Sequence, residues 1–169
     1  MPSLRDCFDR HGCDRGDRHG YERVYEPLFA MIRNQPLRIL EIGIFKGAGI
    51  WAWLDYFPKA TVFGIDTFQR VAPEQVEVLK HERVEWQQLN STRHGLFSGT
   101  FDIIIDDGCH RADAQLATWR NFYPALKPGG MYFIEDVWPK GPGYAELVAA
   151  LPDPIHHKLG KPDSYILQC

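Results

Sequence analysis

FDIIIDDGCH, residues 101 to 110, is the stretch from which the fold class of this chain follows. Its three β-branched residues, Ile103 to Ile105, favour a strand that is buried on both faces, as strands of a parallel sheet are. Polar side chains return abruptly at the end of this strand, with Asp106, Asp107 and His110. In an open α/β sheet, ligands bind just beyond the carboxyl ends of the strands, so these side chains are placed for chemistry.

A second stretch repeats this design. The apolar residues MYFI, 131 to 134, are followed at once by Glu135 and Asp136. If the two strands are neighbours, Asp107, Glu135 and Asp136 converge in one crevice, where three carboxylates would repel one another. A divalent cation such as Mg²⁺ is the simplest group that would hold them together. The alternative is that Asp106 or Asp107 caps the next helix and Asp136 faces solvent.

The rest of the chain alternates between strand and helix patterns. We expect strands at 37–44, 61–66, 84–89, 101–106 and 130–134, and helices at 21–34, 50–56, 73–80, 112–126 and 144–151. Such alternation predicts an α/β fold with a Rossmann-like, doubly wound and mostly parallel sheet. Residues 156–161 and 164–169 are expected to add a C-terminal antiparallel hairpin with its turn at 160–163. We expect one domain over residues 1–169, in which residues 1–20 form an N-terminal arm of loop and short helical pieces.

Composition excludes several classes of function. The net charge of −3 gives no electrostatic basis for binding nucleic acid or an anionic membrane. No apolar run approaches the roughly 20 residues of a membrane-spanning helix, and the first 20 residues lack the apolar core of a signal peptide. The four cysteines show no CxxC spacing, which favours free thiols in a reducing compartment, so we expect a cytoplasmic protein.

A glycine-rich turn follows the first expected strand, in the pattern Glu41-x-Gly43-x-x-x-Gly47-x-Gly49. Glycines at such a turn let the backbone pass close to a ligand. The spacing is not GxGxxG, which argues against a dinucleotide, and Glu41 suits a cationic ligand group better than a phosphate. The alternative is a plain strand-to-helix turn.

Two further residues stand where a ligand or a proton transfer would need them. Asp66 ends the second expected strand, 66 − 43 = 23 residues after Gly43, and a carboxylate there can accept both hydroxyls of a ribose. The imidazole of His110 titrates near neutral pH and suits proton abstraction from an alcohol. The alternatives are a solvated strand-end acid or helix cap for Asp66, and a surface or capping histidine for His110. The loop 138–144 is expected to lie over the crevice.

The order of these motifs resembles that of a known family. LEIGIFKGAG, GID, FDIIIDDGCH and LKPGGMYFIED together resemble the class I S-adenosylmethionine-dependent methyltransferases. More narrowly, they resemble the metal-dependent O-methyltransferases of sugars and small molecules, the group of the mycinamicin and macrocin O-methyltransferases and of cephalosporin-hydroxylase-like proteins. The segment CDRGDRHGYERVYEPLF, residues 13 to 29, is similar to the DKG…H.Y…Y segment of that group.

The resemblance implies a cofactor, a metal and a role for each matching residue. It implies S-adenosylmethionine as methyl donor, Mg²⁺ held by Asp107, Glu135 and Asp136, and His110 as general base. Asn90 and Ser91 stand where many relatives have an acidic residue near the adenine. The residues that the resemblance assigns to the cofactor pocket are Tyr21, Tyr25, Glu41, Gly43, Gly47, Asp66, Asn90, Ser91 and Asp106.

The function expected from motifs and resemblance together is Mg²⁺-dependent methyl transfer to a hydroxyl of a sugar or another small-molecule diol, as in natural-product tailoring. The partner is then a small-molecule hydroxyl substrate, with no nucleic acid and no membrane, and a homo-oligomer is compatible with the sequence. Two alternatives stay open. One is a methyltransferase-like protein that binds the cofactor without turnover. The other is a nucleotide-dependent oxidoreductase, against which Glu41 and the glycine spacing argue.

Overall fold

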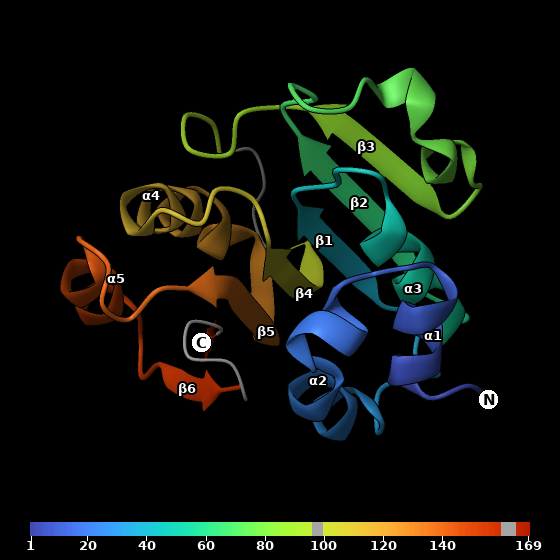
Figure 1. The fold of residues 1–169 in the computed structure, drawn as a ribbon, viewed down its shortest axis with the longest axis horizontal. Coiled ribbons are helices and arrows are strands. Elements are labelled where there is room, and N and C mark those ends of the chain that lie inside the picture. The colour runs from blue at the N-terminus through green and yellow to red at the C-terminus, as the bar shows by residue number, and fades with distance from the viewer. Residues whose placement is uncertain (96–99, 160–164) are drawn as a thin grey trace.

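The computed structural model describes residues 1–95, 100–159 and 165–169, and these residues build one sheet between two layers of helices (Figure 1). The strands follow the order β3-β2-β1-β4-β5-β7-β6. Strands β1 to β5 are parallel, whereas β7 is antiparallel to both β5 and β6. Their bounds are β1 Arg38–Ile42, β2 Thr61–Asp66, β3 Val84–Gln88, β4 Phe101–Asp106, β5 Leu126–Val137, β6 Ile155–Lys158 and β7 Tyr165–Gln168.

This architecture confirms the predicted mostly parallel sheet with a C-terminal antiparallel hairpin. The turn predicted at 160–163 lies outside the described residues. None of the helices in the described ranges is both long and apolar enough to cross a membrane.

The helices cover the two faces of the sheet unequally (Figure 1). Helices α1 to α3 lie against one face and α4 and α5 against the other, and each face has its own apolar core. The helical segments are α1 Leu4–Arg10, η1 Arg15–His19, α2 Glu22–Phe29, α3 Ala48–Tyr56, η2 Pro73–Gln75, η3 Glu77–Lys80, α4 Ala112–Phe122, η4 Tyr123–Ala125 and α5 Tyr144–Ala150.

Residues 1–20 contain the predicted short helical pieces, but they pack into the core and do not form a separate arm. Helix α1 begins with a capping box at Ser3, and Leu4, Cys7 and Phe8 are fully buried. These three residues have the i, i+3, i+4 spacing of one helical face, which the surrounding charges obscure in the sequence. The ring of Phe8 packs edge-on against Trp53 at 5.3 Å, so the N-terminal segment belongs to the core.

Four other segments differ from the sequence prediction. The helix predicted over 21–34 ends at Phe29. The helix predicted over 73–80 is instead two short 3-10 turns, because Val76 between them is extended. Strand β5 begins at Leu126 rather than at 130, and α4 ends at Phe122. The early start of β5 follows from pairing of Leu126 with Phe101, with a register shift immediately after that pair.

The register of the central strands places the functional edge of the sheet. Ile42, at the end of β1, lies opposite Ile65 of β2 and Asp106 of β4. Asp106 in turn lies opposite Ile134 of β5. The residues that follow these strands therefore gather at one edge, on both sides of β1, where the strand order reverses and α/β proteins bind their ligands.

Candidate active site

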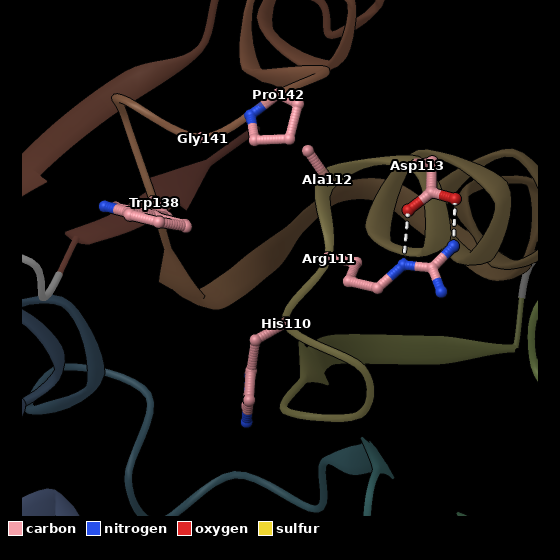
Figure 2. Close-up of a pocket in the computed structure, with 7 residues that line it drawn as sticks. All are labelled: His110, Arg111, Ala112, Asp113, Trp138, Gly141 and Pro142. Carbon is pink, nitrogen blue, oxygen red and sulfur yellow. Dashed lines mark hydrogen bonds and ion pairs between the residues drawn. The ribbon is translucent and has the colours of Figure 1, made fainter.

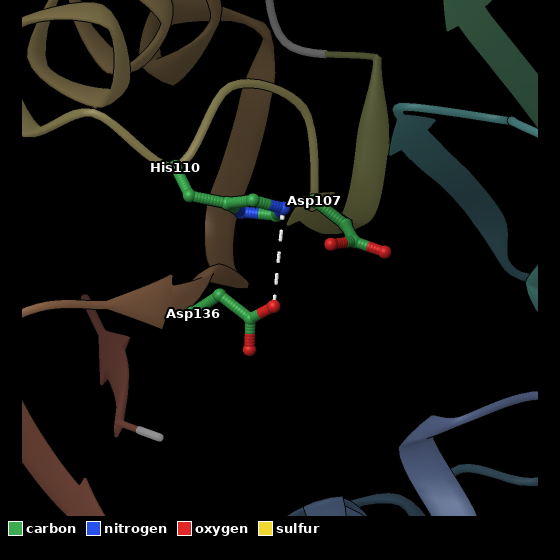
Figure 3. Close-up of side chains that lie close together, drawn as sticks. All are labelled: Asp107, His110 and Asp136. Atoms are coloured by element: carbon green, nitrogen blue, oxygen red, sulfur yellow. Dashed lines mark ion pairs between the residues drawn. The ribbon is translucent and has the colours of Figure 1, made fainter. Parts of the chain in front are cut away.

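Asp107, His110 and Asp136 meet at this edge (Figure 3). One ligand atom from each side chain lies within 4.8 Å of the other two, and Nε2 of His110 is 3.9 Å from Oδ2 of Asp136. Both carboxylate side chains are 29% exposed and His110 is 49% exposed. The group is thus open to solvent on one side, as a metal site that also takes water or substrate must be.

An unusual backbone conformation brings Asp136 to this group. Its φ is +50°, in the left-handed region that non-glycine residues rarely adopt, and the pairing of β5 with β7 shifts register between Ile134 and Val137. The Tyr21 hydroxyl donates to the Asp136 carboxylate and also accepts from the Asp136 backbone N–H at 3.3 Å. Such strain persists where surrounding contacts fix it, and it is frequent at functional sites.

The predicted third carboxylate, Glu135, lies behind this group and is bound by Arg15, a residue that the sequence motifs did not single out. Arg15 is 3% exposed, and its Nε donates to both oxygens of Glu135 at 2.8 and 2.9 Å. Nη2 donates to Asp107 at 2.9 Å and Nη1 to Glu41 at 3.3 Å. The guanidinium of Arg15 therefore contacts three carboxylates from different strands. Asp107 directly follows β4, Glu41 lies in β1 and Glu135 lies in β5.

Two aromatic side chains complete the contacts of the buried acids. The Tyr25 hydroxyl donates to Glu135, and the Trp53 indole N–H donates to Glu41. The Arg15 guanidinium also lies over the Trp53 ring, 5.5 Å from its centre. Glu41 and Glu135 are each 1% exposed, so both depend on these partners to offset the cost of burial.

The acidic cluster, defined here as Glu41, Asp107, Glu135 and Asp136, carries more negative charge than Arg15 can balance. If all four carboxylates were ionised, the one guanidinium would leave 4 − 1 = 3 negative charges. Burial raises the pKa of Glu135 to about 7 and also raises the pKa of Glu41. The pKa of Asp107 is raised by burial and by the neighbouring carboxylates, although Arg15 opposes the shift. Oxygen donors with unbalanced charge fit a hard divalent cation.

Two glycines of the turn after β1 pack directly against other segments of the chain. Gly43 has φ +97°, and a Cβ there would lie 2.2 Å from the carbonyl oxygen of Asp107. Gly47 has φ +83°, and a Cβ there would lie 2.5 Å from Cγ1 of Val78. The turn therefore needs glycine at both positions to approach the segments after β4 and before β3.

Asp66 fixes the same turn from the end of β2. Its carboxylate accepts the backbone N–H groups of Ile44 at 2.8 Å, Phe45 at 3.0 Å and Phe68 at 2.7 Å. A carboxylate has about four acceptor positions, so one remains for a further donor.

The two residues predicted near the adenine lie directly after β3. Oδ1 of Asn90 accepts the backbone N–H of Thr92 at 3.0 Å, and Oγ of Ser91 lies 2.9 Å from Oγ1 of Thr118 in α4. Both residues are half-buried. These contacts hold the turn at residues 90–92 against α4.

Asp106 lies apart from the acidic cluster. It belongs to β4 and shares with Ile104 the face covered by α4, whereas the cluster lies toward α1 to α3. It accepts the N–H of Gly108 at 3.2 Å, and its Oδ2 has no hydrogen-bond partner among the described residues. Burial raises the pKa of Asp106 to about 7.

His19, in the N-terminal segment, is the second histidine near Asp136, after His110. Nδ1 of His19 lies 3.8 Å from Oδ1 of Asp136, and its ring packs on Tyr21 with centres 5.0 Å apart. The only sequence signal for Arg15 and His19 was the similarity of the segment 13–29 to the corresponding family segment, because neither residue follows an apolar pattern. Residues 15–25 thus supply the inner contacts of the site.

A small cavity adjoins the group at His110 (Figure 2). Its volume is about 180 Å³, and its walls come from the start of α4 and from the loop after β5. His110 therefore belongs both to the cavity wall and to the carboxylate group, and it stands between the two.

Comparison with known proteins identifies relatives of this arrangement. A family model described as a methyltransferase domain matches residues 40–137. The chain is 35% identical over 156 residues to a tetracenomycin rhamnosyl 3'-O-methyltransferase, 8-demethyl-8-(2-methoxy-alpha-L-rhamnosyl)-tetracenomycin-C 3'-O-methyltransferase of Streptomyces olivaceus, covering 83% of this chain and 38% of that one. It is 29% identical to the mycinamicin VI 2''-O-methyltransferase of Micromonospora griseorubida, covering 81% and 36%.

A solved structure has the same fold. The MycE methyltransferase of the mycinamycin biosynthetic pathway, in complex with Mg and SAH, superposes with a TM-score of 0.75 at 24% identity. The match covers 99% of this chain and 54% of that chain. The chain thus spans less than half the length of the two curated relatives above and about half that of the solved one.

These matches confirm the resemblance expected from the motifs. The family match extends from β1 to the end of β5, and so includes the glycine-rich turn and every carboxylate of the acidic cluster. The chain belongs to the methyltransferase-domain family.

Proposed function

We propose that this chain transfers a methyl group from S-adenosylmethionine to a hydroxyl of a sugar or another small-molecule diol, with Mg²⁺. The observation that carries the proposal is the convergence of Asp107, His110 and Asp136 at the edge of the sheet where such folds bind ligands. The relatives whose names record sugar O-methylation support the class of acceptor. Tailoring of glycosylated natural products is the setting that these names suggest.

Asp107, Glu135 and Asp136 are the proposed Mg²⁺ ligands. A bound Mg²⁺ would orient the acceptor hydroxyl and lower its pKa. Asp107 and Asp136 already point into the same space, whereas Glu135 accepts from Arg15 and Tyr25. Binding of the metal by Glu135 therefore requires that its bonds to Arg15 loosen, and Arg15 keeps Asp107 and Glu41 as partners.

His110 is the proposed general base. His110 lines the cavity, but its Nε2 is directed toward Asp136 and away from the other lining residues (Figures 2 and 3). An acceptor hydroxyl placed at the carboxylates would therefore meet the imidazole. When the imidazole takes the hydroxyl proton it becomes positively charged. The Asp136 carboxylate, 3.9 Å from Nε2, stabilises that charge.

The proposed cofactor pocket lies over the glycine-rich turn. Asp66 has acceptor capacity left for a ribose hydroxyl after its three backbone bonds. Positioning of donor and acceptor in one crevice supplies a large part of the rate enhancement of a methyl transfer, up to about 7–11 kcal/mol in ideal cases. The residues proposed for this pocket remain Tyr21, Tyr25, Glu41, Gly43, Gly47, Asp66, Asn90, Ser91 and Asp106.

Calorimetric titration tests the proposal. S-adenosylmethionine is titrated into the protein with Mg²⁺ and again with EDTA, and a panel of glycosides and catechols is then assayed for methylation by mass spectrometry. Cofactor binding followed by Mg²⁺-dependent methylation is the expected result. Cofactor binding without turnover of any acceptor identifies a cofactor-binding protein instead. Binding of NAD or NADP in place of S-adenosylmethionine overturns the assignment in favour of an oxidoreductase.

A further inference from the structure

Two aspartates at the edge of the sheet converge with an imidazole (Figure 3). One ligand atom each from Asp107, His110 and Asp136 lies within 4.8 Å of the other two. This set differs from the proposed Mg²⁺ ligands, because it includes His110 and leaves out Glu135. The same two aspartates therefore belong to two alternative ligand sets.

The contacts of Glu135 favour the set that contains His110. The Glu135 carboxylate is 1% exposed and accepts from Nε of Arg15 at 2.8 and 2.9 Å and from the Tyr25 hydroxyl. A cation that binds Glu135 must displace one of these donors inside the protein, and a buried donor left unpaired costs free energy. A cation held by the two aspartates and His110 displaces none of the donors to Glu135.

Both aspartates keep acceptor capacity on the side where they converge. Asp107 accepts from Nη2 of Arg15 through Oδ2, and Asp136 accepts from the Tyr21 hydroxyl through Oδ1. Oδ2 of Asp136 instead faces Nε2 of His110 at 3.9 Å. Because a carboxylate has about four acceptor positions, each aspartate can bind a cation while it keeps its protein partner.

The donor atoms of this set suit Zn²⁺ better than Mg²⁺. Mg²⁺ prefers an octahedron of oxygens, in which neighbouring ligand atoms lie about 2.9 Å apart. Zn²⁺ accepts imidazole as readily as carboxylate, and two corners of its tetrahedron lie about 3.3–3.6 Å apart. The 3.9 Å between Nε2 of His110 and Oδ2 of Asp136 is closer to the zinc spacing.

We propose that Asp107, His110 and Asp136 form an inhibitory Zn²⁺ site, which competes with Mg²⁺ for the two aspartates. The fourth position is open to water, because the aspartate side chains are 29% exposed and His110 is 49% exposed. Zinc on Nε2 removes the lone pair with which that nitrogen would accept a hydroxyl proton. The binding of zinc is independent of methyl transfer, whereas the inhibition rests on the proposed function.

Titration of the whole chain with Zn²⁺ against a chromophoric chelator tests the site without turnover. The Cys109→Ser background is used, because Cys109 is exposed next to His110 and thiolates bind zinc. In that background His110→Ala is expected to raise the dissociation constant for Zn²⁺ at least about tenfold. His94→Ala, at an exposed histidine, is expected to leave it unchanged.

Co²⁺ in place of Zn²⁺ reports the coordination geometry. Four-coordinate Co²⁺ absorbs visible light far more strongly than six-coordinate Co²⁺, so the parent protein is expected to show an intense visible band. His110→Ala is expected to lose that band, and His94→Ala to keep it.

Glu135→Gln separates the two ligand sets. This variant is expected to bind Zn²⁺ as the parent does, because Glu135 is not a zinc ligand. In the parent, Mg²⁺ is expected to raise the apparent dissociation constant for Zn²⁺. In Glu135→Gln the Mg²⁺ concentration needed for the same effect should rise at least about tenfold. Thermal unfolding confirms that each variant remains folded.

Several results would overturn the zinc site. They are equal Zn²⁺ affinity in His110→Ala, loss of Zn²⁺ binding in Cys109→Ser or in Glu135→Gln, and weak visible absorption of bound Co²⁺. S-adenosylmethionine binding and Mg²⁺-dependent methylation are measured separately in zinc-free buffer. Zinc binding without any methylation would keep the zinc site and refute the proposed function. Methylation that persists at saturating Zn²⁺ would keep the proposed function and refute the inhibition.

Discussion

Gly49 lies directly against Arg15: a Cβ on Gly49 would stand 2.1 Å from Nη1 of Arg15. The same Cβ would lie 2.4 Å from Oε1 of Glu41. The first turn of α3 therefore packs on the Arg15–Glu41 ion pair with no space for even a methyl group. The last glycine of the turn motif is required by a buried charge from the N-terminal segment.

Gly49→Ala is expected to destabilise the protein by about 1–3 kcal/mol, because the added methyl group overlaps the ion pair. Urea unfolding followed by circular dichroism measures the change. In an Arg15→Met background the same substitution should cost less, since the guanidinium is gone. An equal loss of unfolding free energy in the two backgrounds would show that the added methyl group does not clash with Arg15.

Arg15→Met is expected to destabilise the protein by about 3–5 kcal/mol, because it leaves Glu41 and Glu135 buried without their cation. Arg15→Lys should recover part of this loss, since lysine keeps the charge but lacks the planar fork. Arg18→Met is the matched control, at an arginine whose side chain is 66% exposed, and is expected to change stability by no more than about 0.5 kcal/mol. Denaturant unfolding distinguishes these values, and a neutral Arg15→Met would contradict the role given to this network.

Neutralising each proposed ligand should weaken metal binding. Asp107→Asn, Glu135→Gln and Asp136→Asn are each expected to raise the dissociation constant for Mn²⁺, used as a probe for Mg²⁺, by at least about tenfold. Electron paramagnetic resonance of free Mn²⁺ measures this directly. Asp113→Asn, at an exposed carboxylate paired with Arg111, is the control and should bind normally. Normal binding by Glu135→Gln would assign the metal to Asp107, Asp136 and His110 instead.

His110→Ala is expected to reduce methyl transfer by about 10²–10⁴-fold while cofactor binding is retained, because the variant lacks the proposed base but none of the proposed cofactor contacts. Single-turnover assays measure the transfer step and calorimetry the binding. His94→Ala, at an exposed histidine, controls for the loss of an imidazole. Full activity of His110→Ala would refute the base assignment.

The cysteines are expected to differ sharply in reactivity. Burial raises the pKa of the Cys7 and Cys13 thiols to about 11 and that of Cys169 to about 12, so all three stay protonated up to pH 9. Cys109 is exposed. Ellman's reagent at pH 8 should therefore modify Cys109 rapidly in the native protein and all four cysteines in denaturant. A fast thiol that persists in Cys109→Ser would contradict these environments.

The sequence predicted those parts of the fold that local patterns control. Strands 61–66 and 101–106 match the structure because their apolar and β-branched runs end sharply at Asp66 and Asp106. The N-terminal arm was misassigned because its buried face has few members among many charges. The single predicted helix at 73–80 failed because Val76 adopts an extended conformation that the sequence did not reveal.

The sequence predicted those site residues whose position depends only on following the end of a strand. Neighbouring carboxylates point to opposite faces of a strand, so alternation separates Asp106 from the acidic cluster. Asp136 joins the cluster through a register shift in β5 and a left-handed backbone conformation, neither of which the residue pattern predicts. The contacts of Arg15 could not be predicted, because its partners Glu41, Asp107 and Glu135 are 26, 92 and 120 residues away in the sequence.

That distance along the chain couples assembly of the site to completion of the fold. Arg15 meets Asp107 across 92 residues and Glu135 across 120, and Tyr21 meets Asp136 across 115. Until β5 has joined the sheet, docking of the N-terminal segment would bury a guanidinium without its main acceptor, which is strongly unfavourable. The segment can therefore dock only after β5 has paired with β4. A chain that lacks this pairing cannot assemble the centre, so affinity for the proposed metal would report whether β5 is in place.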